Sequence, residues 1–129
     1  MLRTSILALG LAGLGAAAAA LPPAAPPGDA AKGKTTFARC AACHAVVPGK
    51  NGVGPSLAGV IGRKSGAVAG YRYSPAMQKA GLTWDEATIA RFIAAPSKLV
   101  PGTKMMAAPV TNPQDQANIV AYLKTVSAK

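Results

Sequence analysis

The two cysteines and the single histidine of this 129-residue chain all fall within five residues, Cys40-Ala41-Ala42-Cys43-His44. A structural zinc site needs four Cys or His ligands, and these three residues cannot supply them. Two thiols three residues apart, followed directly by an imidazole, leave two chemistries open. One is the covalent attachment of haem, and the other is a redox disulfide.

The spacing of this pentapeptide favours haem. Thiols three residues apart can reach both vinyl groups of one porphyrin, and the next imidazole then meets the iron from the same face. A thioredoxin-type disulfide is expected in a βαβ context, and it gives no reason for the only histidine to follow the second thiol. We therefore predict one haem, attached through Cys40 and Cys43 and ligated by His44.

The composition supports a prosthetic group in the core. The chain has 2 Phe, 3 Tyr and 1 Trp against 14 Gly and 11 Pro, so its own side chains supply little apolar surface. At roughly 25 cal/mol per Å² of buried apolar surface, a porphyrin contributes on the order of several kcal/mol, comparable with the net stability of a small domain. We expect the haem-free chain to be largely unfolded.

Residues 1–20 have the pattern of a signal peptide, with Arg3, an apolar run and small residues over 16–20. The run is somewhat shorter than the roughly 20 residues of a spanning helix, so an uncleaved membrane anchor is the minority alternative. We predict export to the periplasm, an oxidising compartment. Residues 21–28 form a Pro/Ala-rich linker, which we expect to be extended, and residues 29–129 form the folded domain.

The hydrophobic pattern predicts an all-α domain of four to five helices with long loops, because no long alternating strand pattern occurs. Thr83 and Glu86 fit a capping box, and Pro96 is expected to stop the helix that they start. Ser74 and Asn112, each followed by Pro, are predicted N-caps. The predicted helices are 29–42, 74–80, 83–95 and 112–126, and the long loops are 48–70 and 98–111.

A methionine is the remaining soft ligand for the sixth iron position. The segment Pro101-Gly102-Thr103-Lys104-Met105 favours Met105, because a tight extended loop can lay a thioether against iron without a helix. Core filling is the usual role of methionine, which suits Met77, and Met106 points elsewhere if the segment is extended. Met77, Met106 and an open sixth position remain alternatives.

The chain resembles class I cytochromes c of the mitochondrial-like and bacterial periplasmic branch. The resemblance covers residues 28–126 and rests on GDAAKGKTTFARCAACH, GPSLAGVIGRKSG, YRYSP, GLTW, PGTKM and IVAYLK in that order. It implies the class I fold around one covalent haem c, with His44 and Met105 on the iron. It also implies a mono-haem electron carrier that is not an enzyme and transfers one electron by an outer-sphere route at the haem edge.

The resemblance assigns roles to further residues. The carbonyl of Pro55 would accept a hydrogen bond from the second ring nitrogen of His44. Arg63, Tyr73 and Trp84 would hold the haem propionates, although Trp84 suits a core anchor and Arg63 a solvated charge. Thr103 would brace a propionate or an ordered water. The positions that match the crossing of the first and last helices are Gly33, Phe37, Ile119 and Tyr122.

Three residues depart from the family pattern. Phe92 replaces a frequent Tyr, Ala107 replaces an aromatic residue, and Met77 replaces a polar amide. Each change leaves the Met105 side of the haem less hydrogen-bonded or more open. A haem enzyme or gas sensor with a labile sixth position is therefore the rival interpretation, although His44 is the only histidine and no distal one exists.

The net charge of +10 comes from 14 lysines and arginines against 4 acidic residues. Export argues against nucleic acid as the partner, and we expect a monomer. The resemblance implies redox partners with acidic patches, such as a cytochrome bc1-type complex, a terminal oxidase, a reductase or a photosynthetic reaction centre. An anionic membrane surface is a second partner. The residues expected to ring the haem edge are Lys34, Arg39, Lys50, Lys98 and Lys104.

Overall fold

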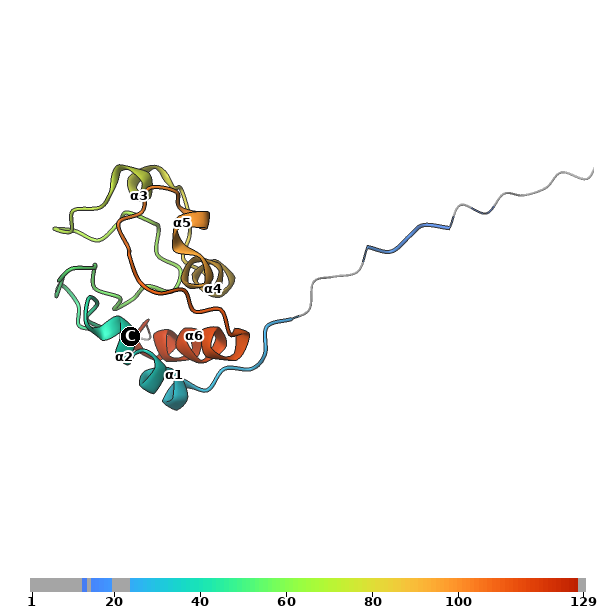
Figure 1. Cartoon of the computed structure of the whole chain (residues 1–129), viewed down its shortest axis with the longest axis horizontal. Coiled ribbons are helices and arrows are strands. Elements are labelled where there is room, and N and C mark those ends of the chain that lie inside the picture. Colours follow the sequence, from blue (N-terminus) through green and yellow to red (C-terminus); the bar gives the residue numbers. More distant parts are fainter. Residues whose placement is uncertain (1–12, 14, 20–23, 128–129) are drawn as a thin grey trace, which may run out of the picture.

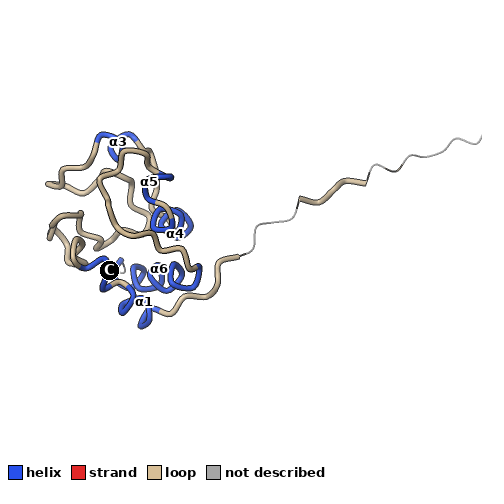
Figure 2. The backbone as a smooth tube through the Cα atoms, viewed as in Figure 1, coloured by secondary structure: helices blue, strands red, loops and turns tan. Residues whose placement is uncertain are grey.

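The computed structural model describes residues 13, 15–19 and 24–127. Most of the predicted signal peptide and the first three residues of the predicted linker lie outside them. The described part contains six helices and, besides them, one antiparallel bridge between Lys64 and Thr83 (Figures 1 and 2). The helices are α1 (Ala30–Thr36), α2 (Ala38–Ala41), α3 (Pro75–Lys79), α4 (Glu86–Ala94), α5 (Pro96–Leu99) and α6 (Pro113–Ser127).

The predicted all-α architecture with long loops is confirmed, and two N-caps are as expected. The hydroxyl of Ser74 accepts a hydrogen bond from the backbone N–H of Met77 at 3.1 Å. The side chain of Asn112 accepts from the backbone N–H groups of Gln114 and Asp115. No helix in the described part is long and apolar enough to cross a membrane.

Three predicted helix boundaries are wrong. The first helix is broken at Phe37, so α1 and α2 replace the single helix 29–42. Helix α4 is capped by Asp85, which accepts from Thr88, and not by Thr83, which pairs with Lys64. Pro96 ends α4 as expected, but it also starts α5, which takes two residues from the predicted loop 98–111.

The first and last helices cross at close range. A Cβ at Gly33 would overlap the backbone carbonyl of Asn118 in α6, so only glycine allows this approach. The rings of Phe37 and Tyr122 pack beside the crossing, with centroids 5.2 Å apart. Ile119 is 1% exposed at the same contact. The crossing predicted from the family resemblance is therefore present.

The contact with α6 extends into the residues before α1. Gln114 donates to the carbonyl of Pro27 at 2.8 Å, and the backbone N–H of Asp29 donates to the side chain of Asn118 at 2.9 Å. A Cβ at Gly28 would overlap the carbonyl of Ala117. The end of the predicted linker thus lies against α6 in a fixed position.

The remaining helices lie on the other side of the molecule. In Figure 1, α1, α2 and α6 occupy the lower half, and α3, α4 and α5 occupy the upper half. Helix α4 packs against α6, and Lys124 of α6 forms an ion pair with Glu86 of α4. Long loops join the two halves (Figure 2).

We expect Gly33→Ala to destabilise the protein by about 3 kcal/mol, because the new methyl overlaps backbone rather than a side chain that could turn away. We expect this loss of stability even though alanine has the better helix propensity. Denaturant unfolding of the haem-bound protein measures the change in the free energy of unfolding. Lys34→Ala, an exposed change in the same helix, should stay within about 0.5 kcal/mol of the wild type. A wild-type midpoint for Gly33→Ala would contradict the tight crossing.

Candidate functional site

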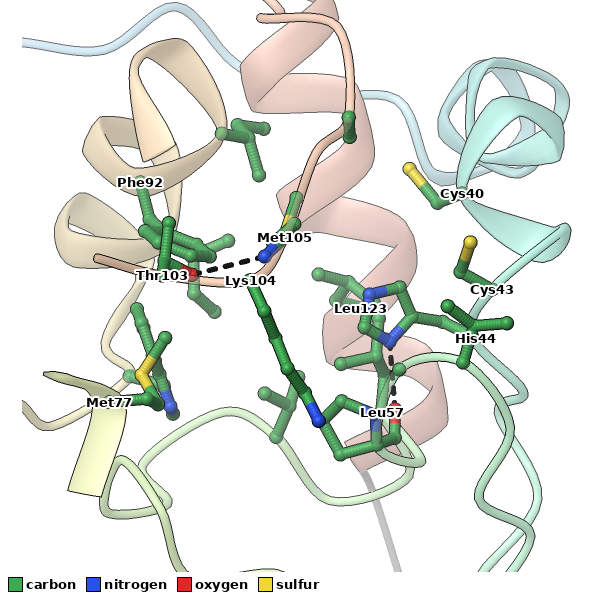
Figure 3. Close-up of a pocket in the computed structure, with 18 of the residues that line it drawn as sticks. Cys40, Cys43, His44, Leu57, Met77, Phe92, Thr103, Lys104, Met105 and Leu123 are labelled. Carbon is green, nitrogen blue, oxygen red and sulfur yellow. Dashed lines mark hydrogen bonds between the residues drawn. The ribbon is translucent and has the colours of Figure 1, made fainter. Parts of the chain in front are cut away.

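A cavity of about 420 Å³ lies between the two halves of the molecule (Figure 3). Its volume is within the range of cofactor sites, about 300–1,000 Å³. Its wall is mostly apolar, and the side chains come from segments far apart in sequence. The apolar residues that line it include Phe37, Met77, Ile89, Phe92, Ile119 and Leu123.

Helix α2 and the turn after it bring both thiols and the imidazole to this cavity. The backbone N–H groups of Cys43 and His44 both donate to the carbonyl of Cys40, at 3.1 and 2.9 Å. The two cysteines are not joined to each other. Burial raises the pKa of the Cys40 thiol, and Arg39 opposes this effect. Figure 3 shows both sulfur atoms and the His44 ring at the same side of the cavity.

The ring of His44 is held by a backbone carbonyl. Its Nδ1 lies 2.8 Å from the carbonyl oxygen of Pro55, and since a carbonyl only accepts, Nδ1 carries the proton and donates. Burial lowers the pKa of His44, although the bond to Pro55 opposes this, so the ring is neutral at pH 7. Nε2 is then the unprotonated nitrogen, which is the form that binds a metal.

Gly54, which the sequence analysis missed, makes room for the same ring. A Cβ at Gly54 would lie 2.6 Å from Nδ1 of His44 and closer still to another ring atom. The signal for this residue was its place directly before Pro55. Only glycine lets the backbone pass so close to the imidazole.

Met105 lies half-buried in the cavity wall, on the loop between α5 and α6. Its backbone N–H donates to the hydroxyl of Thr103 at 3.3 Å, and Thr103 also lines the cavity. Met77 is 8% exposed within the core, whereas Met106 is 88% exposed. Figure 3 shows Met105 and His44 reaching the cavity from different segments, with Met77 farther away beside α3.

Arg63 brings a buried donor without a partner to the cavity. Its Nη1 donates to the carbonyl of Ala58 at 3.2 Å, and its Nε is buried with no hydrogen bond. Burial lowers the pKa of Arg63, and Tyr73 opposes that effect. The alternative of a solvated charge is therefore wrong for Arg63. An unpaired buried donor on a cationic group is suited to an anionic ligand group.

Tyr73 and Trp84 also line the cavity. The hydroxyl of Tyr73 accepts from the backbone N–H of Val68 at 3.0 Å, which leaves its own proton to donate. Trp84 is 8% exposed and packs on Phe92 with ring centroids 5.1 Å apart. Trp84 thus anchors the core and faces the cavity as well.

The predicted docking residues do not all lie at the cavity. Arg39 and Lys104 line it, whereas Lys34, Lys50 and Lys98 are exposed elsewhere. Lys104 is not a free cation, because its Nζ lies 4.6 Å from the ring centroid of Tyr71 and donates to the carbonyl of Arg72. Sequence reasoning did not predict this contact, which joins the loop of Lys104 to the loop of Tyr71 and Arg72.

The four acidic residues take no part in the cavity wall. Asp29 and Asp85 cap α1 and α4, and Glu86 and Asp115 lie in the first turns of α4 and α6. Carboxylates at these positions stabilise the positive ends of helix dipoles. The rim of the cavity therefore carries positive charge only.

The residues present fit a haem c group. Two thiols lie beside a neutral, oriented imidazole, a thioether reaches the cavity from another loop, and the unpaired Nε of Arg63 suits a carboxylate. Thioether attachment, His/Met ligation and an apolar pocket are what this cofactor requires.

Comparisons with known proteins agree with this geometry. The family described as Cytochrome c matches residues 30–127. Cytochrome c2 iso-2 from Magnetospirillum fulvum is 53% identical over 90 residues, which are 70% of this chain and 94% of that protein. Cytochrome c2 from Rhodoblastus acidophilus is 53% identical over 102 residues, which are 78% of this chain and 95% of that protein.

A solved structure extends the likeness to the fold. Cytochrome cH from Methylobacterium extorquens is 50% identical and superposes with a TM-score of 0.72, covering 76% of this chain and 99% of that one. The family match covers most of the chain, and the relatives align over nearly their whole length. The chain therefore belongs to the cytochrome c family, whose members carry one covalent haem c through a C-x-x-C-H sequence such as the one that ends at His44.

Proposed function

We propose that this protein is an exported, periplasmic electron carrier that moves one electron at a time between redox complexes. The observation that supports it most is the oriented imidazole of His44, held at 2.8 Å by Pro55 in a cavity shared with both thiols and Met105. Membership of the cytochrome c family agrees with a carrier rather than an enzyme.

The proposed roles of the cavity residues follow from their chemistry. Cys40 and Cys43 would attach the haem, and His44 and Met105, which come from two separate segments, would ligate its iron. When bound, the haem supplies an iron that cycles between the ferrous and ferric states. Arg63, Tyr73 and Trp84 offer donors to its propionates, and Thr103 holds the backbone of Met105.

This arrangement suits a carrier because the ligands do not need to move. Pro55 fixes the ring of His44, Thr103 fixes the Met105 backbone, and the apolar wall excludes water. A fixed and dry site needs little reorganisation when its charge changes. Electron transfer would then be an outer-sphere event at the haem, with no change in the ligands that this chain supplies.

We propose that the partners present acidic patches. Arg39 and Lys104 lie at a cavity rim without carboxylates, and a positive rim steers an acidic surface in a salt-dependent way. A cytochrome bc1-type complex, a terminal oxidase, a reductase or a photosynthetic reaction centre fits this description. The only contribution to docking that we expect from the other three lysines is to the long-range electrostatic field; they are Lys34, Lys50 and Lys98.

A second function, gas sensing or peroxide chemistry at an opened iron, is favoured by one observation. Phe92 lines the cavity without a hydroxyl, and within the described residues no side chain donates to the sulfur of Met105. The only polar support of Met105 is therefore the backbone bond to Thr103. This function requires Met105 to leave the iron readily.

Carbon monoxide separates the two functions. The spectrum of the reduced wild-type protein should ignore carbon monoxide, because Met105 occupies the sixth position. Met105→Ala should give a prompt shift. Met77→Leu, a volume-conserving core change, should behave as the wild type does. A prompt shift in the wild-type protein would contradict the carrier function and support the second one.

The second test concerns the orientation of His44. Gly54→Ala should displace the His44 ring from the carbonyl of Pro55, because the new methyl group overlaps the ring. The variant should therefore give a lower yield of protein that both binds haem and has a spectrum resistant to carbon monoxide. Gly52→Ala is the matched control, because its Cβ meets only the carbonyl of Cys43 at 3.4 Å. Equal yields and spectra for the two variants would show that the ring does not depend on this passage.

A further inference from the structure

Met106 stands at the opening of the cavity with its side chain in solvent. It lines the cavity and is 88% exposed, so it lies on the rim and not in the wall. Val53, from the loop before Gly54, is 75% exposed and lines the same cavity. Val53 and Met106 together form the apolar rim of the cavity.

The three methionines in the described part of the chain differ sharply in access. Met77 is 8% exposed, and Met105 is half-buried, with its sulfur assigned to the iron in the proposed function. Met106 is neither buried nor assigned to the iron. Methionine oxidation follows exposure, and it converts a flexible apolar side chain into a polar sulfoxide.

We propose that Met106 is a site of oxidation by peroxides that weakens docking of the redox partner. The thioether sulfur gives two electrons to the peroxide and forms a bond to one oxygen, while the O–O bond breaks and the other oxygen leaves as water or an alcohol. Met105 stays bound, because its side chain is half-buried and its sulfur is assigned to the iron in the proposed function. The chain therefore keeps its iron ligands and changes only its surface.

The effect on docking rests on the proposed function. A partner that approaches the positive rim with Arg39 and Lys104 must also remove water from the apolar rim. A sulfoxide holds water there, so the contact loses apolar burial while all charges stay the same. A tenfold weaker binding corresponds to about 1.4 kcal/mol, slightly less than the roughly 1.5–3 kcal/mol gained when a Met side chain is fully buried.

Peptide mass spectrometry tests the oxidation itself. The haem-bound ferric protein is treated with limiting hydrogen peroxide, and fragmentation locates each added oxygen. We expect one oxygen at Met106 before any at Met77 or Met105, and Met106→Leu should gain none in that peptide. First oxidation at Met77 or Met105 would overturn the proposal. This result depends on access alone, so it stands apart from the carbon monoxide test of the proposed function.

A surface of known chemistry tests the docking effect. The probe is a monolayer with mixed carboxylate and methyl ends, and its affinity is measured for each form of the protein. Peroxide-treated wild-type protein and Met106→Gln should bind about tenfold more weakly than untreated protein. Met106→Leu should bind normally before and after peroxide. Unchanged binding of wild-type protein that carries oxygen on Met106 would overturn the docking effect, and a carbon-monoxide-resistant spectrum in each variant shows that Met105 is still bound.

Discussion

The structure depends on a central cavity that the chain itself cannot fill. A mostly apolar cavity of about 420 Å³ leaves its lining side chains either exposed to water or without packing partners, and both are unfavourable for a small domain of marginal stability. The chain has few aromatic side chains to close the space. The covalent haem of the cytochrome c family is therefore a structural element as much as a functional one.

The close crossing of α1 and α6 gives this cavity a fixed wall. Gly33 lets two backbones touch, and the chain then turns at Phe37 into the helix that carries Cys40. Helix α4, which packs on α6 as well, supplies a further part of the cavity wall. Loops supply much of the remaining wall, so the proposed ligands His44 and Met105 reach the cavity from segments far apart in the sequence. A short domain can thus hold two iron ligands with little regular structure between them.

Local rules predicted the features that depend on neighbouring residues, and they failed where tertiary contacts decide. Ser74 and Asn112 cap their helices as their sequences indicate. Asp85 caps α4 in place of Thr83, because Thr83 pairs with Lys64 in an antiparallel β-bridge. The contact between His44 and Pro55 was implied by the family resemblance and is present. The contact of Lys104 with Tyr71 joins two loops more than 30 residues apart in the chain, and no local pattern reveals it. The close approach of Gly54 to the His44 ring was signalled only by the place of Gly54 directly before Pro55.

The central claim is that the iron changes charge while His44 and Met105 stay bound, and voltammetry of the protein on an electrode tests it most directly. The account predicts one reversible wave that follows a one-electron Nernst curve, about 59 mV per tenfold change in ratio, with a midpoint independent of scan rate. A second wave that grows at slow scan rates would show that a ligand exchanges with each electron. That result would contradict the account of a fixed-ligand carrier.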